Sequence, residues 1–499
     1  MSLVVGIDIG TQGTKAALFD ADGACLAEAL VASQLHRPKP GVVEEDPERQ
    51  VDSVCKAVRK CLKDAKADAG DVVGVGIDGQ MAGVIGVGRD GQCVTPYDSW
   101  LDTRCAPYIK KMEQQAGDEV LAKTGCVPSF NHGPKKLWWK HERKAAYRKI
   151  AAFVQPGGYA AMRLCGLTGE QAFIDTTYLH FSGFADNQRG RWDEGLCEQF
   201  GLDMAKLPRI VKPQEVVGQV TATMAKRCGL KAGTCVVAGC GDTAASFLAA
   251  GATQAGVCVD VAGTASVFAA TTGKFRADVK QRVLACGRSA VPGLWHPYAY
   301  INGGGMNLEW FREQVASAGK RRGGMSLTKL NELAEAVAVA ADNPMFVPHL
   351  GGRVSPPQPN LRGAWIGLSW DHTLGHLYRA VLEGVAMEYA VYKDVLGGLY
   401  RGAAVKELRV TGGGEKSGLW NTIKSDALQT PVRRIERSFG APAGAAMLAA
   451  WGVGLVGSLE QIAADWVALS TATKPQRRLA KHYQNRAARY QKLLNVLDE

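Results

Sequence analysis

One acidic residue stands where a buried strand is expected to turn into a helix. The segment Cys235-Val236-Val237-Ala238 is β-branched and apolar, and Gly241-Asp242-Thr243 with a run of small residues follows it. A carboxylate at such a junction can face a cleft and take the proton of a hydroxyl group that attacks a phosphoryl group. Asp is also favoured as a helix N-cap. Asp242 is therefore predicted to be either a general base or a cap.

A second carboxylate, Asp8, ends the first predicted strand, residues 3–9. The turn Gly10-Thr11-Gln12-Gly13-Thr14 follows it. Small residues and hydroxyls leave the backbone N–H groups of such a turn open to a phosphate. A carboxylate beside the turn can hold Mg²⁺, usually through water. Lys15, next along the chain, is either a phosphate contact or an exposed strand residue.

The chain repeats this pattern about half its length later, at Val257-Cys258-Val259-Asp260-Val261-Ala262-Gly263-Thr264. Two such loops predict one polyphosphate held between two related domains. The alternative is two ordinary buried strands that end in tight turns. The second copy has one more residue between its Asp and its Gly-Thr, so Asp260 is not expected to repeat the role of Asp8.

Other polar residues and glycines also follow predicted strands. Asp78 and Asp102 come after apolar segments, where each can bind substrate hydroxyls or cap a turn. The glycine triplets 303–305 and 412–414 permit close approach of a base or a phosphate. The histidines show no metal-ligand spacing, and no GxSxG elbow supports serine hydrolysis.

These residues need strands and helices to position them. We predict strands at 3–9, 15–19, 24–31 and 72–77, with a helix from about Glu45 to Ala65 before the last of them. A strand meander followed by helix and strand is not the βαβ alternation of a dinucleotide fold. Residues 104–230 are expected to be a helix-rich insertion. We expect two α/β domains, residues 1–250 and 251–499, packed around a shared cleft.

The composition is that of an ordinary globular protein, with 499 residues, 46% of them hydrophobic, and a net charge of +11. The basic residues are scattered, which disfavours nucleic-acid binding. Thirteen cysteines without a CxxC pair are expected to be reduced core residues. No apolar run approaches the roughly 20 residues that span a bilayer, and no secretion signal is evident at the start. We therefore expect a cytoplasmic protein without membrane or nucleic-acid partners.

The ordered motifs resemble those of the FGGY carbohydrate kinases, and among these the xylulokinases most closely. The first loop, residues 7–15, is similar to the family's first phosphate loop, and Gly79-Gln80-Met81-Ala82-Gly83 resembles the pentulose-kinase GQMHG segment. Lys136-Leu137-Trp138-Trp139 resembles the first family signature, although Gly133 departs from it. The most specific match is the second signature, in which Gly363 to Leu368 is followed, seven residues later, by His376 to Glu383.

The resemblance implies two ribonuclease H-like domains of the actin and hexokinase type, with ATP and Mg²⁺ in the cleft. Asp242 would be the catalytic base and Asp8 would support the metal. Closure of the domains would exclude water. The implied nucleotide contacts are Thr11, Gln12, Gly13, Lys15, Gly263, Thr264, Gly305, Gly413, Gly414 and Ser417.

The expected acceptor is a sugar, with D-xylulose first and another ketopentose or a polyol as alternatives. Ala82 replaces the His that xylulokinases use on the sugar, and Thr243 replaces the Asn that follows their catalytic Asp. Such changes can alter discrimination strongly where a site relies on polar contacts. Besides Asp242, the substrate candidates are Gln80, Met81, Ala82, Trp100, Asp102, Asp175, Tyr178 and Thr243.

Two rival functions use the same fold. An actin-like or chaperone-like ATPase would be expected to carry a polymerising or peptide-binding element, and none is evident in the sequence. A silent sugar-binding regulator would not need Asp242 and both phosphate loops. The sequence leaves the oligomeric state open, including a homodimer.

Overall fold

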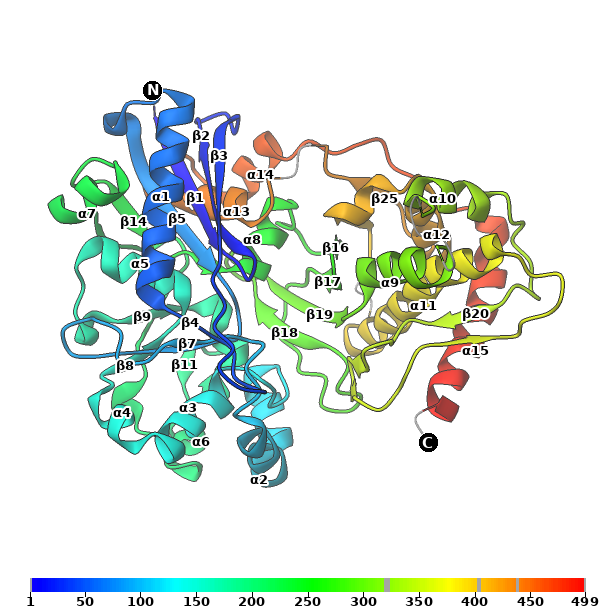
Figure 1. Cartoon of the computed structure of the whole chain (residues 1–499), viewed down its shortest axis with the longest axis horizontal. Helices are drawn as coiled ribbons and strands as arrows, with labels where there is room; N and C mark the ends of the chain where they lie inside the picture. The colour runs from blue at the N-terminus through cyan, green and yellow to red at the C-terminus, as the bar shows by residue number, and fades with distance from the viewer. Residues whose placement is uncertain (1, 318–323, 402–404, 437–438, 498–499) are drawn as a thin grey trace.

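The computed structural model describes residues 2–317, 324–401, 405–436 and 439–497. The chain forms two lobes, each built on a mixed β-sheet (Figure 1). The first sheet has the strand order β13-β14-β5-β1-β2-β3, with β15 also paired to β5. Its strands are β1 (Leu3–Ile9), β2 (Gly13–Phe19), β3 (Cys25–Ala32), β5 (Val72–Gly79), β13 (Val216–Gln219), β14 (Cys235–Val237) and β15 (Cys240–Gly241).

The second sheet repeats the core of the first. Its order is β18-β19-β17-β16-β24-β25, so that β16, β17, β19, β24 and β25 correspond to β1, β2, β3, β5 and β14. In both sheets the first three of these strands pair antiparallel, the fourth pairs in parallel with the first, and the fifth pairs in parallel with the fourth. This is the duplicated ribonuclease H-like arrangement expected from the sequence. The strands are β16 (Val257–Ala262), β17 (Ser266–Ala270), β18 (Ala285–Arg288), β19 (Trp295–Ile301), β24 (Glu407–Thr411) and β25 (Val432–Arg434).

Helices cover the first sheet and alternate with short strands in the segment between β5 and β14. Helix α1 begins after Asp46, whose carboxylate accepts a hydrogen bond from Glu48 N, and Pro47 occupies the first turn. Helix α5 packs beside α1 on the same core. The helices of this half are α1 (Pro47–Ala65), α2 (Ala106–Thr124), α3 (His132–Glu142), α4 (Lys144–Lys149), α5 (Pro156–Cys165), α6 (Glu194–Gln199), α7 (Ala222–Cys228) and α8 (Asp242–Ala249).

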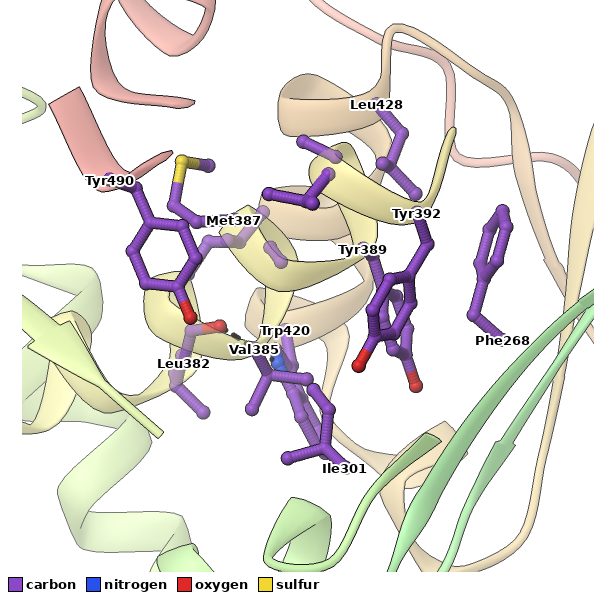
Figure 2. Packing of buried hydrophobic residues seen from close by; sticks show 14 of the residues in the cluster. Phe268, Ile301, Leu382, Val385, Met387, Tyr389, Tyr392, Trp420, Leu428 and Tyr490 are labelled. Carbon is purple, nitrogen blue, oxygen red and sulfur yellow. Dashed lines mark hydrogen bonds between the residues drawn. The ribbon is translucent and has the colours of Figure 1, made fainter. Parts of the chain in front are cut away.

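The core of the second half is built around one long helix. Apolar residues recur along α11, and three of them, Leu382, Val385 and Tyr389, are buried in the cluster that contains Trp420 and Phe268 (Figure 2). Trp420 Nε1 donates to Leu382 O at 3.1 Å, so this large side chain is satisfied inside the core. The helices of this half are α9 (Gly304–Trp310), α10 (Leu327–Glu335), α11 (Leu374–Leu399), α12 (Gly418–Leu428), α13 (Ala441–Gly452), α14 (Leu459–Trp466) and α15 (Ala480–Leu497).

Two helices carry the packing between the halves. Helix α13 comes from the second half of the sequence, yet it packs on β1, β5 and α8. Helix α8 comes from the first half, and its Phe247 joins a cluster with Val259 and Ala269 of the second sheet. The packing therefore links the two sheets through α13 and α8.

Glycines allow α13 to lie unusually close to its neighbours. A Cβ at Gly6 of β1 would lie 1.7 Å from Pro442 O, and one at Gly76 of β5 would lie 2.1 Å from Ala445 O. On α13 itself, a Cβ at Gly444 would lie 2.1 Å from Ala245 O of α8. Each of these atoms belongs to backbone, which cannot move aside as a side chain can. The glycines are therefore required for the contact between the halves.

None of the helices in the described ranges combines the length and apolarity needed to cross a membrane. All thirteen cysteines are free, and each is buried or half-buried. Their burial agrees with the expectation of reduced core residues.

We predict that Gly444→Val destabilises the protein by about 1–3 kcal/mol, because the added side chain must push α13 away from α8. Gly397→Ala is the matched control, since Gly397 lies in α11 with nothing within 4 Å of an added Cβ. Ala has the higher helix propensity, so this control should stabilise by about 0.5–1 kcal/mol. Denaturant unfolding of both variants measures the difference. A Gly444→Val protein as stable as the parent would contradict the close crossing.

Candidate active site

Three carboxylates from three elements meet at the end of the first sheet. Asp8 of β1 and Asp78 of β5 are direct partners in the parallel register, and Asp242 is the first residue of α8. Both strands belong to one buried sheet, and β15, which leads into α8, also pairs with β5. The fold therefore places Asp8 and Asp242 close to Asp78, for which the sequence had left open whether it binds substrate hydroxyls or caps a turn.

The environment opposes the charge on all three groups. Burial, together with the nearby Asp8 charge, raises the pKa of Asp242 to about 7. Burial raises the pKa of Asp8 to about 6, although a hydrogen bond with Asp78 and the charge of Lys15 counteract it. The pKa of Asp78 lies well above its ordinary range because of burial and the Asp8 carboxylate beside it. Such clustering of shifted carboxylates is typical of functional sites.

Several oxygens of these carboxyl groups have no hydrogen-bond donor outside the cluster. Both oxygens of Asp78 and Oδ1 of Asp8 are buried, and the only contact available to them is the one between the two carboxyl groups themselves. Within the described residues, no group of three or more His, Cys, Asp and Glu side chains is arranged to hold a metal by itself. Mg²⁺ usually takes only one or two carboxylates and completes its shell with water and phosphates. The donor set at Asp8 and Asp78 therefore fits this ion.

Asp242 is not the cap of its helix. Gly241 occupies the N-cap position without a side-chain hydrogen bond, and Asp242 Oδ1 instead accepts from Thr243 Oγ1 at 3.1 Å. Gly241 N donates to Thr177 Oγ1 at 2.9 Å, and Thr177 in turn donates to Asp175. The loop that carries Asp242 is therefore fixed by polar contacts, while the carboxylate is left available for chemistry. Of the two interpretations from sequence, the cap is excluded.

The expected substrate segment lies directly against this loop. Met81 Sδ would lie only 1.8 Å from a Cβ at Gly241, so the thioether fills the space above that glycine. His132 Nε2 is 2.6 Å from Met81 O, and burial keeps the pKa of His132 well below its usual value. The neutral ring therefore holds the backbone just before Ala82. Ala82 itself is half-buried.

A small enclosed cavity adjoins this segment at the start of α8. It lies between the two halves, because residues of both line it. Tyr178, another sequence candidate, donates from its hydroxyl to Gly79 O at 2.9 Å and so braces β5 beside the cavity. The polar and apolar lining includes Met81, Thr177, His180, Thr243, Arg288 and Tyr298.

Two other substrate candidates, Trp100 and Gln80, form a network with Thr11 of the first loop. Trp100 Nε1 donates to Thr11 Oγ1 at 2.8 Å, and Thr11 Oγ1 donates to Gln80 Oε1 at 3.3 Å. The indole of Trp100 is 46% exposed. Asp102 differs, since its carboxylate pairs with Arg104 and accepts from Val43 N. These contacts favour a structural role for Asp102.

The remainder of the first loop is held by the neighbouring strands. Gln12 O accepts from Ser33 N at 3.0 Å, and Gly13 packs against Val31 O. Lys15 faces Asp8 across the β1–β2 register, and its ammonium is 2.9 Å from the carboxylate of Glu28.

The nucleotide candidates of the second half come together around the end of β16. Gly305 N donates to Gly263 O at 2.9 Å, and Met306 N donates to Thr264 O at 3.1 Å, so the second loop is tied to the start of α9. A Cβ at Gly414 would lie 2.5 Å from the side chain of Ala262. Gly413 follows β24 with open space around it, and Ser417 caps α12 by accepting from Trp420 N at 3.2 Å.

Asp260 lies one residue earlier in β16 than the position that corresponds to Asp8, and its charge is neutralised. Lys424 forms a buried ion pair with Asp260 Oδ2, and Tyr389 donates to Asp260 Oδ1 at 2.6 Å. The residue that corresponds to Asp8 is Val261, and its parallel-strand partner is Thr411, where β5 has Asp78. Asp260 therefore serves the core, in agreement with the sequence expectation that it does not repeat the role of Asp8.

Sequence reasoning missed part of the site. Asp78 was left as a hydroxyl ligand or a turn cap, although its position one residue before the end of a strand matches that of Asp8. Arg288 was not considered, because its approach to the cavity from β18 depends on how the halves pack. Conversely, two charged residues of the second signature are structural, since Arg379 and Glu383 form a buried ion pair 2.9 Å long.

Comparison with known proteins supports the same architecture. The N-terminal domain of the FGGY family of carbohydrate kinases matches residues 3–249, and its C-terminal domain matches residues 258–453. The xylulose kinase of Bacillus subtilis is 28% identical over 490 residues, covering 97% of this chain and 95% of the relative. The gluconokinase of the same organism is 25% identical over 491 residues, covering 97% and 93%.

A solved structure extends this likeness to three dimensions. The xylulose kinase from Rhodospirillum rubrum superposes with a TM-score of 0.90 at 27% identity, covering 99% of each chain. The family domains, the duplicated sheets and this superposition agree over nearly the whole chain. The chain belongs to the FGGY family of carbohydrate kinases.

Proposed function

We propose that this protein transfers the γ-phosphoryl group of ATP to a hydroxyl of a pentulose, with D-xylulose as the first candidate. The observation that carries the proposal is Asp242, a half-buried carboxylate at the start of α8 that is not the helix N-cap and lies near enough to Asp8 for that charge to raise its pKa. The relatives named xylulose kinase support the choice of sugar.

In the proposed reaction Asp242 accepts the proton of the substrate hydroxyl. The hydroxyl oxygen bonds to the γ-phosphorus while the bond from that phosphorus to the bridging oxygen of ADP breaks. A base with a pKa of about 7 is matched to proton transfer near neutral pH. Asp8, with Asp78 beside it, would hold Mg²⁺, which supplies positive charge to the phosphates when bound.

The two loops give the phosphates a place between the halves. Thr11 and the backbone of residues 10–13 would contact the phosphates from the first half, and Gly263, Thr264 and Gly413 would contact the nucleotide from the second. Helices α8 and α13 connect the two sheets. Motion of one half relative to the other about this connection would close the site and exclude water.

A sugar acid is a second candidate acceptor. Arg288 lines the cavity beside Thr243 and donates to the backbone carbonyls of Asn187 and Gln188 rather than to a carboxylate. A guanidinium in such a position suits a substrate carboxylate. The similarity to a gluconokinase is in line with this alternative.

A substrate panel tests the proposed function. We expect ADP release to depend on a ketopentose, with D-xylulose giving the highest kcat/KM among D-xylulose, D-ribulose, xylitol, ribitol and D-gluconate. Preference for gluconate, with a loss of about 100-fold in Arg288→Gln, would select the sugar acid instead. ATP turnover that is independent of every acceptor would reject a sugar kinase and favour an ATPase.

Asp242→Ala should bind ATP as the parent does and lose phosphoryl transfer by a factor of about 10²–10⁴, because the base is absent. Asp242→Asn is a matched variant that keeps the size of the side chain and should be equally impaired. Calorimetric ATP titration and the coupled ADP assay measure the two properties separately. Either variant retaining near-parental kcat would show that the base is assigned to the wrong residue.

Thr243→Val should move the acidic limb of the pH–rate profile to higher pH. The Thr243 hydroxyl stabilises the ionised form of Asp242, so its removal raises the pKa of the base, and the active deprotonated form then requires a higher pH. A hydrogen bond worth about 0.5–1.5 kcal/mol corresponds to a shift of up to about one pH unit. Thr243→Ser keeps the hydroxyl and should leave the limb in place. Identical profiles for the two variants would contradict this role.

A further inference from the structure

Asp78 is a poorly compensated acidic group in the site. Its side chain is fully buried, and neither of its oxygens has a hydrogen-bond donor among the described residues other than the carboxyl of Asp8. The nearest titratable groups that act on it are Asp8 and Asp242, both of the same charge. Burying a carboxylate without a donor or a counter-charge is strongly unfavourable. Asp78 therefore has no evident role in stabilising the fold.

The geometry of β1 and β5 pairs Asp78 with the residue expected to support the metal. Asp8 and Asp78 are register partners on neighbouring parallel strands, so their side chains leave the same face of the sheet about 4.8 Å apart at the backbone. Asp8 Oδ1 is also buried without a donor. Lys15 is the cation nearest in register, but its ammonium is engaged with Glu28.

We propose that Asp78 is a second carboxylate ligand of the divalent cation, so that Asp8 and Asp78 together hold Mg²⁺ even without nucleotide. One oxygen from each side chain can occupy adjacent positions about 2.1 Å from a single Mg²⁺, leaving the other positions to water and phosphate. The ion supplies the positive charge that the surrounding protein lacks. Only its identity as the phosphate-bound cation of the kinase rests on the proposed function.

The second sheet provides an internal comparison. There the residue in the place of Asp8 is Val261, one pair before the end of the β16–β17 ladder as Asp8 is in β1–β2. Its partner across the parallel pair is Thr411, in the place of Asp78. The nearby Asp260 is one residue earlier, and Lys424 and Tyr389 satisfy it inside the core. The pair of facing carboxyl groups is therefore not required by the duplicated fold, which points to a cation at Asp8 and Asp78.

Mn²⁺ titration of the nucleotide-free protein, followed by electron paramagnetic resonance of the free ion, tests the proposal. We expect one Mn²⁺ per chain and a loss of affinity in Asp78→Asn at least tenfold greater than in Asp242→Asn. The second variant is the matched control, because it removes the same charge from the same cluster without removing a proposed ligand. Equal losses would mean that Asp78 attracts the ion only through its charge and is not a ligand, which would overturn the proposal. An unchanged affinity in Asp78→Asn would also reject it.

Two further measurements keep the result interpretable. Thermal unfolding without metal should show Asp78→Asn at least as stable as the parent, because the buried repulsion is relieved, so that weak binding cannot be ascribed to misfolding. A crystal soaked in Mn²⁺ should show anomalous density in contact with both carboxylates, and density in contact with Asp8 alone would overturn the assignment. Mn²⁺ binding without sugar phosphorylation would reject the proposed function while leaving this inference intact.

Discussion

The contact between α13 and the first sheet is the constraint on which the rest of the molecule depends. Backbone carbonyls of α13 lie over Gly6 and Gly76 at distances that exclude any side chain, and Gly444 brings α8 equally close. Strands β1 and β5 and helix α8 carry Asp8, Asp78 and Asp242. The contact that joins the two halves therefore also supports this cluster of carboxyl groups. A shift in α13 would alter both the cleft and the distances between those charges.

The duplicated fold has been used in two electrostatically different ways. In the second sheet Asp260, one residue earlier in its strand than the position of Asp8, is neutralised inside the core by Lys424 and Tyr389. In the first sheet the carboxyl groups of Asp8 and Asp78 face each other across the parallel pair, with Asp242 nearby. The corresponding positions of the second sheet, Val261 and Thr411, carry no carboxylate, so the duplication provides two similar turns but places this acidic cluster beside the first.

The long helix α11 shows why a family signature need not mark catalytic residues. Its Arg379 and Glu383 form a buried pair, and Glu383 also bonds Arg486 of α15 at 2.9 Å. On the next turns Glu388 pairs with Arg353 at 2.8 Å and accepts from Tyr490 at 2.6 Å. These networks attach α11 to the end of the chain. Removing one partner of such a pair would leave an uncompensated buried charge. The charged residues of the signature are therefore required for packing, without any contact to substrate.

Local sequence alone determined the strands, the long helices, the two phosphate-type turns and the position of Asp242 at the start of a helix. Those features follow from side-chain periodicity and turn chemistry, which act over a few residues. The resemblance of the ordered motifs then indicated the duplicated fold and the kinase family. Only the tertiary structure decided that Asp242 is not the N-cap of its helix, that Asp102 pairs with Arg104, and that Asp78 lies beside Asp8. Each of these depends on the register of strands or the crossing of helices distant in sequence. Local sequence patterns do not indicate such long-range pairings.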